Sequence, residues 1–124
     1  MATPKIAISI GDINGVGVQI ALTSHNEIKN FCEPIYCVSK PMIEQAASLL
    51  GITVPEDFIC DEVGEYFTIL PGVVNRASGR ASYESFSRAI TLCESKKVDA
   101  IVTLPIHKKA WELAGVHYVG HTDM

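Results

Sequence analysis

The sequence predicts an α/β fold with a mostly parallel sheet and flanking helices. Short apolar runs rich in β-branched residues occupy residues 5–10, 34–38 and 98–104, and each predicts a strand. Segments whose apolar residues recur at helical spacing lie between these runs. Strands that alternate with helices form right-handed βαβ units, and such units build parallel sheets.

The first predicted strand covers residues 5–10, which are apolar at nearly every position. This pattern is typical of a strand buried on both faces, as in a parallel sheet. Gly11 ends the strand, and a turn that also contains Gly15 and Gly17 leads into a helix expected over residues 18–26.

A second strand is expected at residues 34–38, followed by a helix that Ser39 and Pro41 begin. Gly51 is expected to end this helix. The spacing i, i+3, i+4, i+7 predicts one buried face, composed of Ile43, Ala46, Ala47 and Leu50.

Residues 53–77 give a weaker pattern, in which short apolar pieces at 58–59, 67–70 and 73–74 suggest brief strands between turns. A clear helix is then predicted from about Ser82. Its predicted buried face consists of Tyr83, Phe86, Ile90 and Cys93.

The last predicted strand, residues 98–104, is again expected to be buried. Pro105 ends it, because proline cannot donate a backbone hydrogen bond to a neighbouring strand. A short helix over residues 108–114, ending at Gly115, completes the readable pattern.

The composition excludes several classes of protein. The chain has 124 residues, 48% of them hydrophobic and 19% charged, with a net charge of −4 and no basic block. Neither a nucleic-acid partner nor a membrane partner is therefore expected. The four cysteines form no C-x-x-C pair, and no signal-peptide pattern opens the sequence. We expect reduced thiols and a cytoplasmic protein.

Polar residues gather where the predicted parallel strands end, and ligands of such sheets bind outside these carboxyl ends. Three places satisfy this rule: residues 11–17, 103–109 and 120–123. The first matches neither G-x-G-x-x-G nor the P-loop pattern, so nucleotide binding does not follow from it. It is either a tight turn that lets the helix pack closely, or a site in which Asp12 faces a hydroxyl or a cation.

The other two places also allow two interpretations each. Lys108 could hold a substrate carboxylate or phosphate as a point charge, or could simply solvate the start of a short helix. His121 and Thr122 could bind a polar substrate or donate a proton near neutral pH, or could be ordinary hydrogen-bonded polar residues. His107, His117 and His121 lack the spacing of a zinc motif on a helix.

Taken in series, three segments resemble the amino-terminal part of the 4-hydroxythreonine-4-phosphate dehydrogenase family. The segments are residues 11–17 (G-D-x-x-G-V-G), residues 98–108 (V-D-A-I-V-T-x-P-I-x-K) and residues 120–123 (G-H-T-D), with Ala114-Gly115 before the last. Family members usually have Pro-Ala at positions 13–14, Asn at 107 and Glu at 123. No role is therefore carried over onto His107 or Asp123.

The resemblance implies a fold like that of isocitrate and isopropylmalate dehydrogenases, with two α/β domains, a cleft between them and a homodimer. Residues 1–124 would be the amino-terminal part of the first domain, ending near the crossover to a second domain that the sequence lacks. The resemblance also implies that a small phosphorylated hydroxy amino acid is oxidised by NAD or NADP and then loses carbon dioxide. A divalent metal (Zn, Mg or Co) would assist, with its ligands outside this chain.

For site residues, the resemblance implies that His121 and Thr122 contact the substrate, with Lys108 and Asp12 as further substrate-binding candidates. The implied reaction converts 4-phosphohydroxy-L-threonine to 3-amino-2-oxopropyl phosphate in pyridoxine 5′-phosphate (vitamin B6) biosynthesis. Two alternatives stay open: a paralogous dehydrogenase of 4-phosphothreonate in sugar-acid catabolism, and a non-catalytic ligand-binding module. This piece of the chain alone is expected to be inactive.

Overall fold

The computed structural model describes residues 3–15, 17–106 and 108–115. Its centre is a four-stranded sheet of order β3-β2-β1-β4, in which every pairing is parallel. The strands are β1 (Lys5–Ser9), β2 (Glu33–Cys37), β3 (Ile59–Asp61) and β4 (Ala100–Thr103). The predicted α/β fold with a mostly parallel sheet and flanking helices is thereby confirmed.

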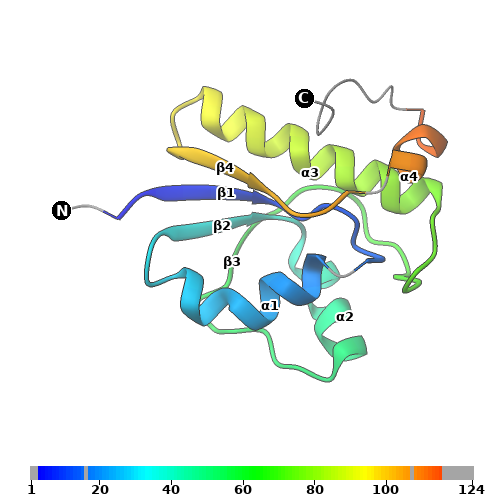
Figure 1. Ribbon diagram of the computed structural model, residues 1–124, viewed down its shortest axis with the longest axis horizontal. Helices are drawn as coiled ribbons and strands as arrows, with labels where there is room; N and C mark the ends of the chain where they lie inside the picture. The colour runs from blue at the N-terminus through cyan, green and yellow to red at the C-terminus, as the bar shows by residue number, and fades with distance from the viewer. Residues whose placement is uncertain (1–2, 16, 107, 116–124) are drawn as a thin grey trace.

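Helices cover both faces of the sheet (Figure 1). The helices are α1 (Gly17–Ile28), α2 (Lys40–Leu50), α3 (Arg76–Glu94) and α4 (Lys108–Leu113). Helices α1 and α2 enclose the larger core, in which Tyr36 and Ile43 are fully buried. Helix α3, with α4 beside it, covers the other face over a smaller core that contains Ala7 and Ala89.

Strand β1 is buried on both faces, as its sequence predicts. Ile8 packs into the core under α1 and α2, whereas Ala7 faces the core under α3. The prediction of a buried last strand is wrong for β4. Ala100 and Val102 are exposed, because β4 lies at the edge of the described sheet and no described helix covers that face of it.

Helix α2 begins and ends where its sequence predicts. Gly51 adopts a left-handed conformation (φ 70°), and its N–H donates to the Ser48 carbonyl. Ile43 and the two following alanines of the predicted face are buried. Leu50 is not, since 39% of its surface stays exposed at the end of the helix.

Between residues 53 and 75 the structure has one strand, β3, which lies near the piece expected at 58–59; the strands expected at 67–70 and 73–74 are wrong. Helix α3 also begins at Arg76, six residues before the predicted start. Asn75 caps it: the side chain of Asn75 accepts from the Ser78 N–H at 2.8 Å, and Ser78 Oγ accepts from the Asn75 N–H at 3.4 Å.

The predicted face of α3 is right only in part: Tyr83 is 42% exposed, whereas Phe86, Ile90 and Cys93 are half-buried. The fully buried residues of α3 are small (Ser78, Gly79, Ser82, Ser85, Ala89) apart from Leu92. The reason is close packing. A Cβ on Gly79 would lie 1.8 Å from the Ala110 carbonyl oxygen in α4, so only glycine permits this helix contact.

Ser85 links α3 to the sheet. Its Oγ accepts from the Ile10 N–H at 2.9 Å and donates to the Cys37 carbonyl oxygen. Both backbone groups lie just where β1 and β2 end. A serine on the helix therefore satisfies buried polar groups at the carboxyl edge of the sheet.

Gly79→Ala tests the close packing of α3 on α4. Alanine has the higher helix propensity by about 1 kcal/mol, but its methyl group would overlap the Ala110 carbonyl. We expect a net loss of roughly 1–3 kcal/mol in the free energy of unfolding of the complete protein, measured by denaturant titration. Thr91→Ala, on the exposed side of α3, is the control and should change stability by less than about 0.5 kcal/mol. A Gly79→Ala protein as stable as the wild type would contradict the packing argument.

Candidate functional site at the carboxyl edge of the sheet

All four strands run in the same direction, so their carboxyl ends meet at one edge of the sheet, opposite the start of β1 (Figure 1). The segments that leave this edge are residues 10–15 after β1, 38–39 after β2, 62–75 after β3 and 104–106 after β4. This is the edge at which ligands of parallel α/β folds bind. Two of the three places that the sequence singles out lie here.

The structure brings residues 10–15 and 104–106 into direct contact. The Asp12 N–H donates to the Pro105 carbonyl oxygen at 2.7 Å. Gly11 has φ 72°, and a Cβ there would lie 2.3 Å from the Pro105 oxygen and 2.5 Å from the Leu104 oxygen. Gly11 is therefore required twice, by its left-handed backbone and by the approach of a second backbone.

Asp12 shapes the turn after β1. Its Oδ1 accepts from the Asn14 N–H at 3.1 Å, and its carbonyl accepts from the Gly15 N–H at 2.9 Å. This is the local pattern that lets an aspartate stabilise a turn. The side chain is half-buried, so it holds the loop at the carboxyl edge, and its role in binding substrate stays a prediction.

The segment of residues 64–75 crosses this edge without forming a strand and is held by two amide side chains. One is Asn14, which is 2% exposed. Its Nδ2 donates to the Val73 carbonyl at 2.9 Å, and its Oδ1 accepts from the Leu70 N–H at 3.0 Å. The Gly72 N–H adds a bond of 2.6 Å to the Asn14 carbonyl.

The other amide side chain is Gln45 of α2. Its Nε2 donates to the Phe67 carbonyl at 2.9 Å, and its Oε1 accepts from the Ile69 N–H at 2.6 Å. Neither amide contact was predicted from the sequence, which suggested strands in the segment that the two amides hold. Their signal was faint, because a single asparagine and a single glutamine in ordinary loop and helix positions carry no motif.

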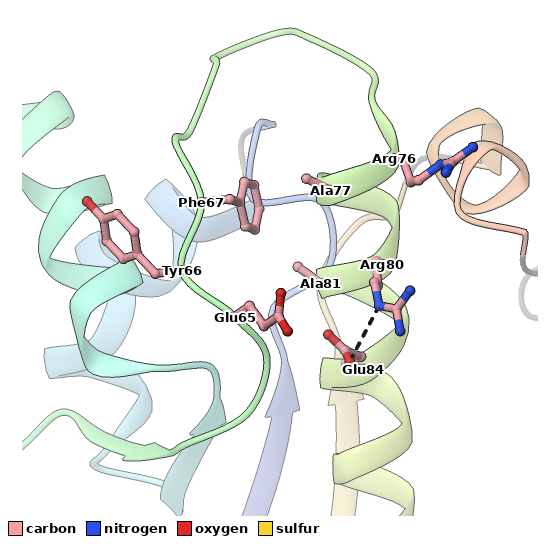
Figure 2. Close-up of a pocket in the computed structure, with 8 residues that line it drawn as sticks. All are labelled: Glu65, Tyr66, Phe67, Arg76, Ala77, Arg80, Ala81 and Glu84. Atoms are coloured by element: carbon pink, nitrogen blue, oxygen red, sulfur yellow. Dashed lines mark ion pairs between the residues drawn. The ribbon is translucent and has the colours of Figure 1, made fainter.

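A cavity of about 330 Å³ opens between this segment and the start of α3 (Figure 2). Phe67 points toward Ala77, and Glu65 points toward the helix (Figure 2). The Arg80 Nε lies 3.8 Å from the Glu84 carboxylate on the same helix. The cavity thus combines apolar walls with charges of both signs, lined by Glu65, Tyr66, Phe67, Arg76, Ala77, Arg80, Ala81 and Glu84.

Two cysteines near the ends of the strands are poor nucleophiles. Burial, reinforced by the Asp61 carboxylate, raises the pKa of Cys37 to about 12. Burial likewise raises the pKa of Cys60 to about 11. Both thiols stay protonated at neutral pH, so neither supports covalent catalysis. Asp61 itself pairs with Arg88, whose Nε donates at 2.7 Å, and this bond raises the pKa of Arg88.

The remaining predicted site residues are placed only in part. Lys108 is the first residue of α4, so its backbone lies shortly after residues 104–106 in the chain. The structure does not describe its side chain. His121 and Thr122 lie outside the described residues, as do His107 and Asp123. Within the described ranges, no three His, Cys, Asp or Glu side chains form a group that could hold a metal ion. No described helix is long and apolar enough to span a membrane.

A parallel sheet with helices on both faces, whose loops meet at its carboxyl edge, places this chain in the α/β class of proteins. Its family follows from comparison with known sequences. The profile of the family described as "Pyridoxal phosphate biosynthetic protein PdxA" matches residues 30–124. This chain belongs to the PdxA family.

Individual relatives support the same assignment. The chain is 52% identical over 124 residues to the 4-hydroxythreonine-4-phosphate dehydrogenase of Sulfurimonas denitrificans and 54% identical over 123 residues to that of Campylobacter fetus. These alignments cover 100% and 99% of the chain but only 40% of each relative. The crystal structure of a 4-hydroxythreonine-4-phosphate dehydrogenase from Burkholderia phymatum superposes with a TM-score of 0.86 at 29% identity, over 98% of this chain and 42% of that one.

Gly11→Ala tests the contact between the two loops. A side chain at this position has to adopt a positive φ and also overlap the backbone of residues 104–105. We expect a loss of about 2–4 kcal/mol in the stability of the complete protein, measured by denaturant unfolding. Gly51→Ala is a matched control, because Gly51 has φ 70° but nothing within 4 Å of its Cβ position. That variant should lose only about 1–2 kcal/mol. Equal losses would show that the loops do not depend on their close approach.

Proposed function

We propose that the complete protein is a 4-hydroxythreonine-4-phosphate dehydrogenase. It would oxidise 4-phosphohydroxy-L-threonine with NAD or NADP and release carbon dioxide to give 3-amino-2-oxopropyl phosphate, a step in pyridoxine 5′-phosphate (vitamin B6) biosynthesis. The observation that carries the proposal is the 52% identity to a relative of that name over all 124 residues. The loops that meet at the carboxyl edge supply a suitable place for a small polar substrate.

The proposal assigns a task to each candidate residue. His121 and Thr122 hydrogen-bond the substrate, and Lys108 neutralises its phosphate or carboxylate. Asp12, already fixed in its turn by the Asn14 N–H, presents a carboxylate edge to a substrate hydroxyl. The contact between residues 10–15 and 104–106 then holds Asp12 and the start of α4 at a constant separation.

Two groups outside this chain complete the proposed reaction. Bound NAD or NADP supplies the hydride acceptor, and a bound divalent ion (Zn²⁺, Mg²⁺ or Co²⁺) polarises the reacting hydroxyl. The described residues contain no set of ligands for such an ion. We propose that the ion's ligands come from the part of the protein that the curated relatives have and this chain does not span.

The proposal extends to architecture and location. The complete protein would have the two-domain fold of isocitrate and isopropylmalate dehydrogenases, would form a homodimer and would work in the cytoplasm. Residues 1–124 would form the amino-terminal part of its first domain. The coverage of only 40% of the Sulfurimonas relative supports this division.

The direct test is turnover by the complete protein. It is assayed with 4-phosphohydroxy-L-threonine, NAD or NADP, and each of Zn²⁺, Mg²⁺ and Co²⁺, with NADH or NADPH followed by absorbance and the product by mass spectrometry. Parallel assays with 4-phosphothreonate compare kcat/KM for the alternative substrate. No reduced nicotinamide with any metal would contradict the proposal, and a higher kcat/KM on 4-phosphothreonate would favour the paralogous enzyme.

Thr122→Ala tests the substrate contact in the same assay. Loss of one hydrogen bond to a polar or charged substrate group should lower kcat/KM roughly 10- to 100-fold. Thr23→Ala is the matched control, because Thr23 is exposed on α1 and its hydroxyl bonds only its own helix. Equal activity of the two variants would remove Thr122 from the substrate site.

A further inference from the structure

Residues 64–75 form a wall along the carboxyl edge, and Glu65 and Phe67 of this wall take part in two cavities. Both line the cavity of about 330 Å³ against α3. Both also line a smaller cavity, of about 20 Å³, whose other side includes Gly11 and Ile13. The wall therefore stands between the loop after β1 and the start of α3.

No β-ladder holds this wall. The Gly72 N–H donates to the Asn14 backbone carbonyl and the Phe67 N–H to Met42 Sδ. Further bonds to the backbone of the wall come from the side chains of Asn14 and Gln45, each of which donates one hydrogen bond and accepts one. A primary amide can do this because its oxygen and nitrogen imitate the C=O and N–H of a peptide. Each side chain thus makes the two hydrogen bonds that a neighbouring strand would otherwise make to this short part of the wall.

Asn14 connects the wall to the rest of the site. It belongs to the same turn as Asp12, whose N–H is tied to the Pro105 carbonyl. A continuous set of bonds therefore runs from the end of β4, through the turn after β1, to Leu70 and Val73. Asn14 itself is 2% exposed, whereas Leu70 and Val73 are 45% and 41% exposed. Loss of the amide would therefore remove one bond from each of two partly exposed backbone groups.

We propose that Asn14 and Gln45 are positioning residues, which fix the wall of residues 64–75 and thereby set the width of the substrate cleft. This inference rests on the proposed function, because it takes the carboxyl edge as the substrate site. Neither amide touches the reacting atoms. Loss of the amide hydrogen bonds to the wall therefore changes how well the substrate fits, and we expect KM to change rather than kcat.

The test uses the complete protein with Asn14→Ala and Gln45→Ala. Hydrogen exchange of the Leu70 amide in the first variant and of the Ile69 amide in the second should become at least about tenfold faster. KM for 4-phosphohydroxy-L-threonine should rise about 5- to 10-fold, with kcat within about twofold of the wild type. Gln45→Glu keeps the acceptor for the Ile69 N–H and loses the donor to Phe67, so its KM should lie between those of the wild type and Gln45→Ala.

Tyr36→Phe is the stability control. The Tyr36 hydroxyl lies 2.8 Å from His25 Nδ1 in the core, so this variant loses a buried hydrogen bond away from the wall. It should lower the melting temperature as the amide variants do, but leave KM unchanged. An equal rise in KM for Tyr36→Phe would reduce the amides to a merely structural role and overturn the proposal.

The remaining outcomes separate this inference from the proposed function. Faster exchange at Leu70 with an unchanged KM would show that the wall is not part of the substrate site. Unchanged exchange would show that the amides do not hold the wall. If the wild type does not turn over the substrate, the proposed function fails. The wall is then judged by whether the substrate or NAD slows exchange over residues 65–73, and no slowing with either overturns the inference.

Discussion

The approach of two backbones at Gly11 is the constraint on which the rest of the carboxyl edge depends. Strands β1 and β4 pair with Ser9 opposite Thr103, and the Leu104 N–H continues this pairing to the Ser9 carbonyl at 2.9 Å. The chain that leaves β1 must then turn at Gly11, where it lies against the backbone of Leu104 and Pro105. Only a residue without a Cβ fits there, and the bond from Asp12 to Pro105 fixes the two loops against each other.

Other contacts hold α3 and α4 in position at the same edge of the sheet. Ser85 satisfies backbone groups where β1 and β2 end, which holds α3 at its distance from the sheet. Trp111 of α4 packs edge-on against Tyr83 and donates from its Nε1 to Ser82 Oγ at 2.8 Å. The start of α4, where Lys108 lies, is therefore positioned from two directions: by residues 104–106 along the chain and by α3 beside it.

Sequence reasoning predicted what local pattern controls. The apolar run of β1, the Pro41 and Gly51 boundaries of α2, and the glycine turn after β1 all follow from periodicity and backbone preference. It failed where tertiary packing overrides hydrophobicity. Large apolar residues were expected on the buried side of α3, but small residues occupy most of it, among them Gly79 at the contact with α4, and Tyr83 is 42% exposed. The wall of residues 64–75 was hidden for a related reason, because side-chain amides rather than a strand pattern hold it.

The central claim is that substrate binds at the carboxyl edge, and a crystal structure of the complete protein with 4-phosphohydroxy-L-threonine and NAD tests it most directly. We expect the substrate to lie against residues 10–15 and 104–108, with His121 and Thr122 in hydrogen-bonding distance. Another cavity, of about 570 Å³ and so larger than the one beside α3, lies at the opposite edge and is lined by His25, Lys29 and Glu33 among others. Substrate bound there, with the carboxyl edge empty, would contradict substrate binding at the carboxyl edge.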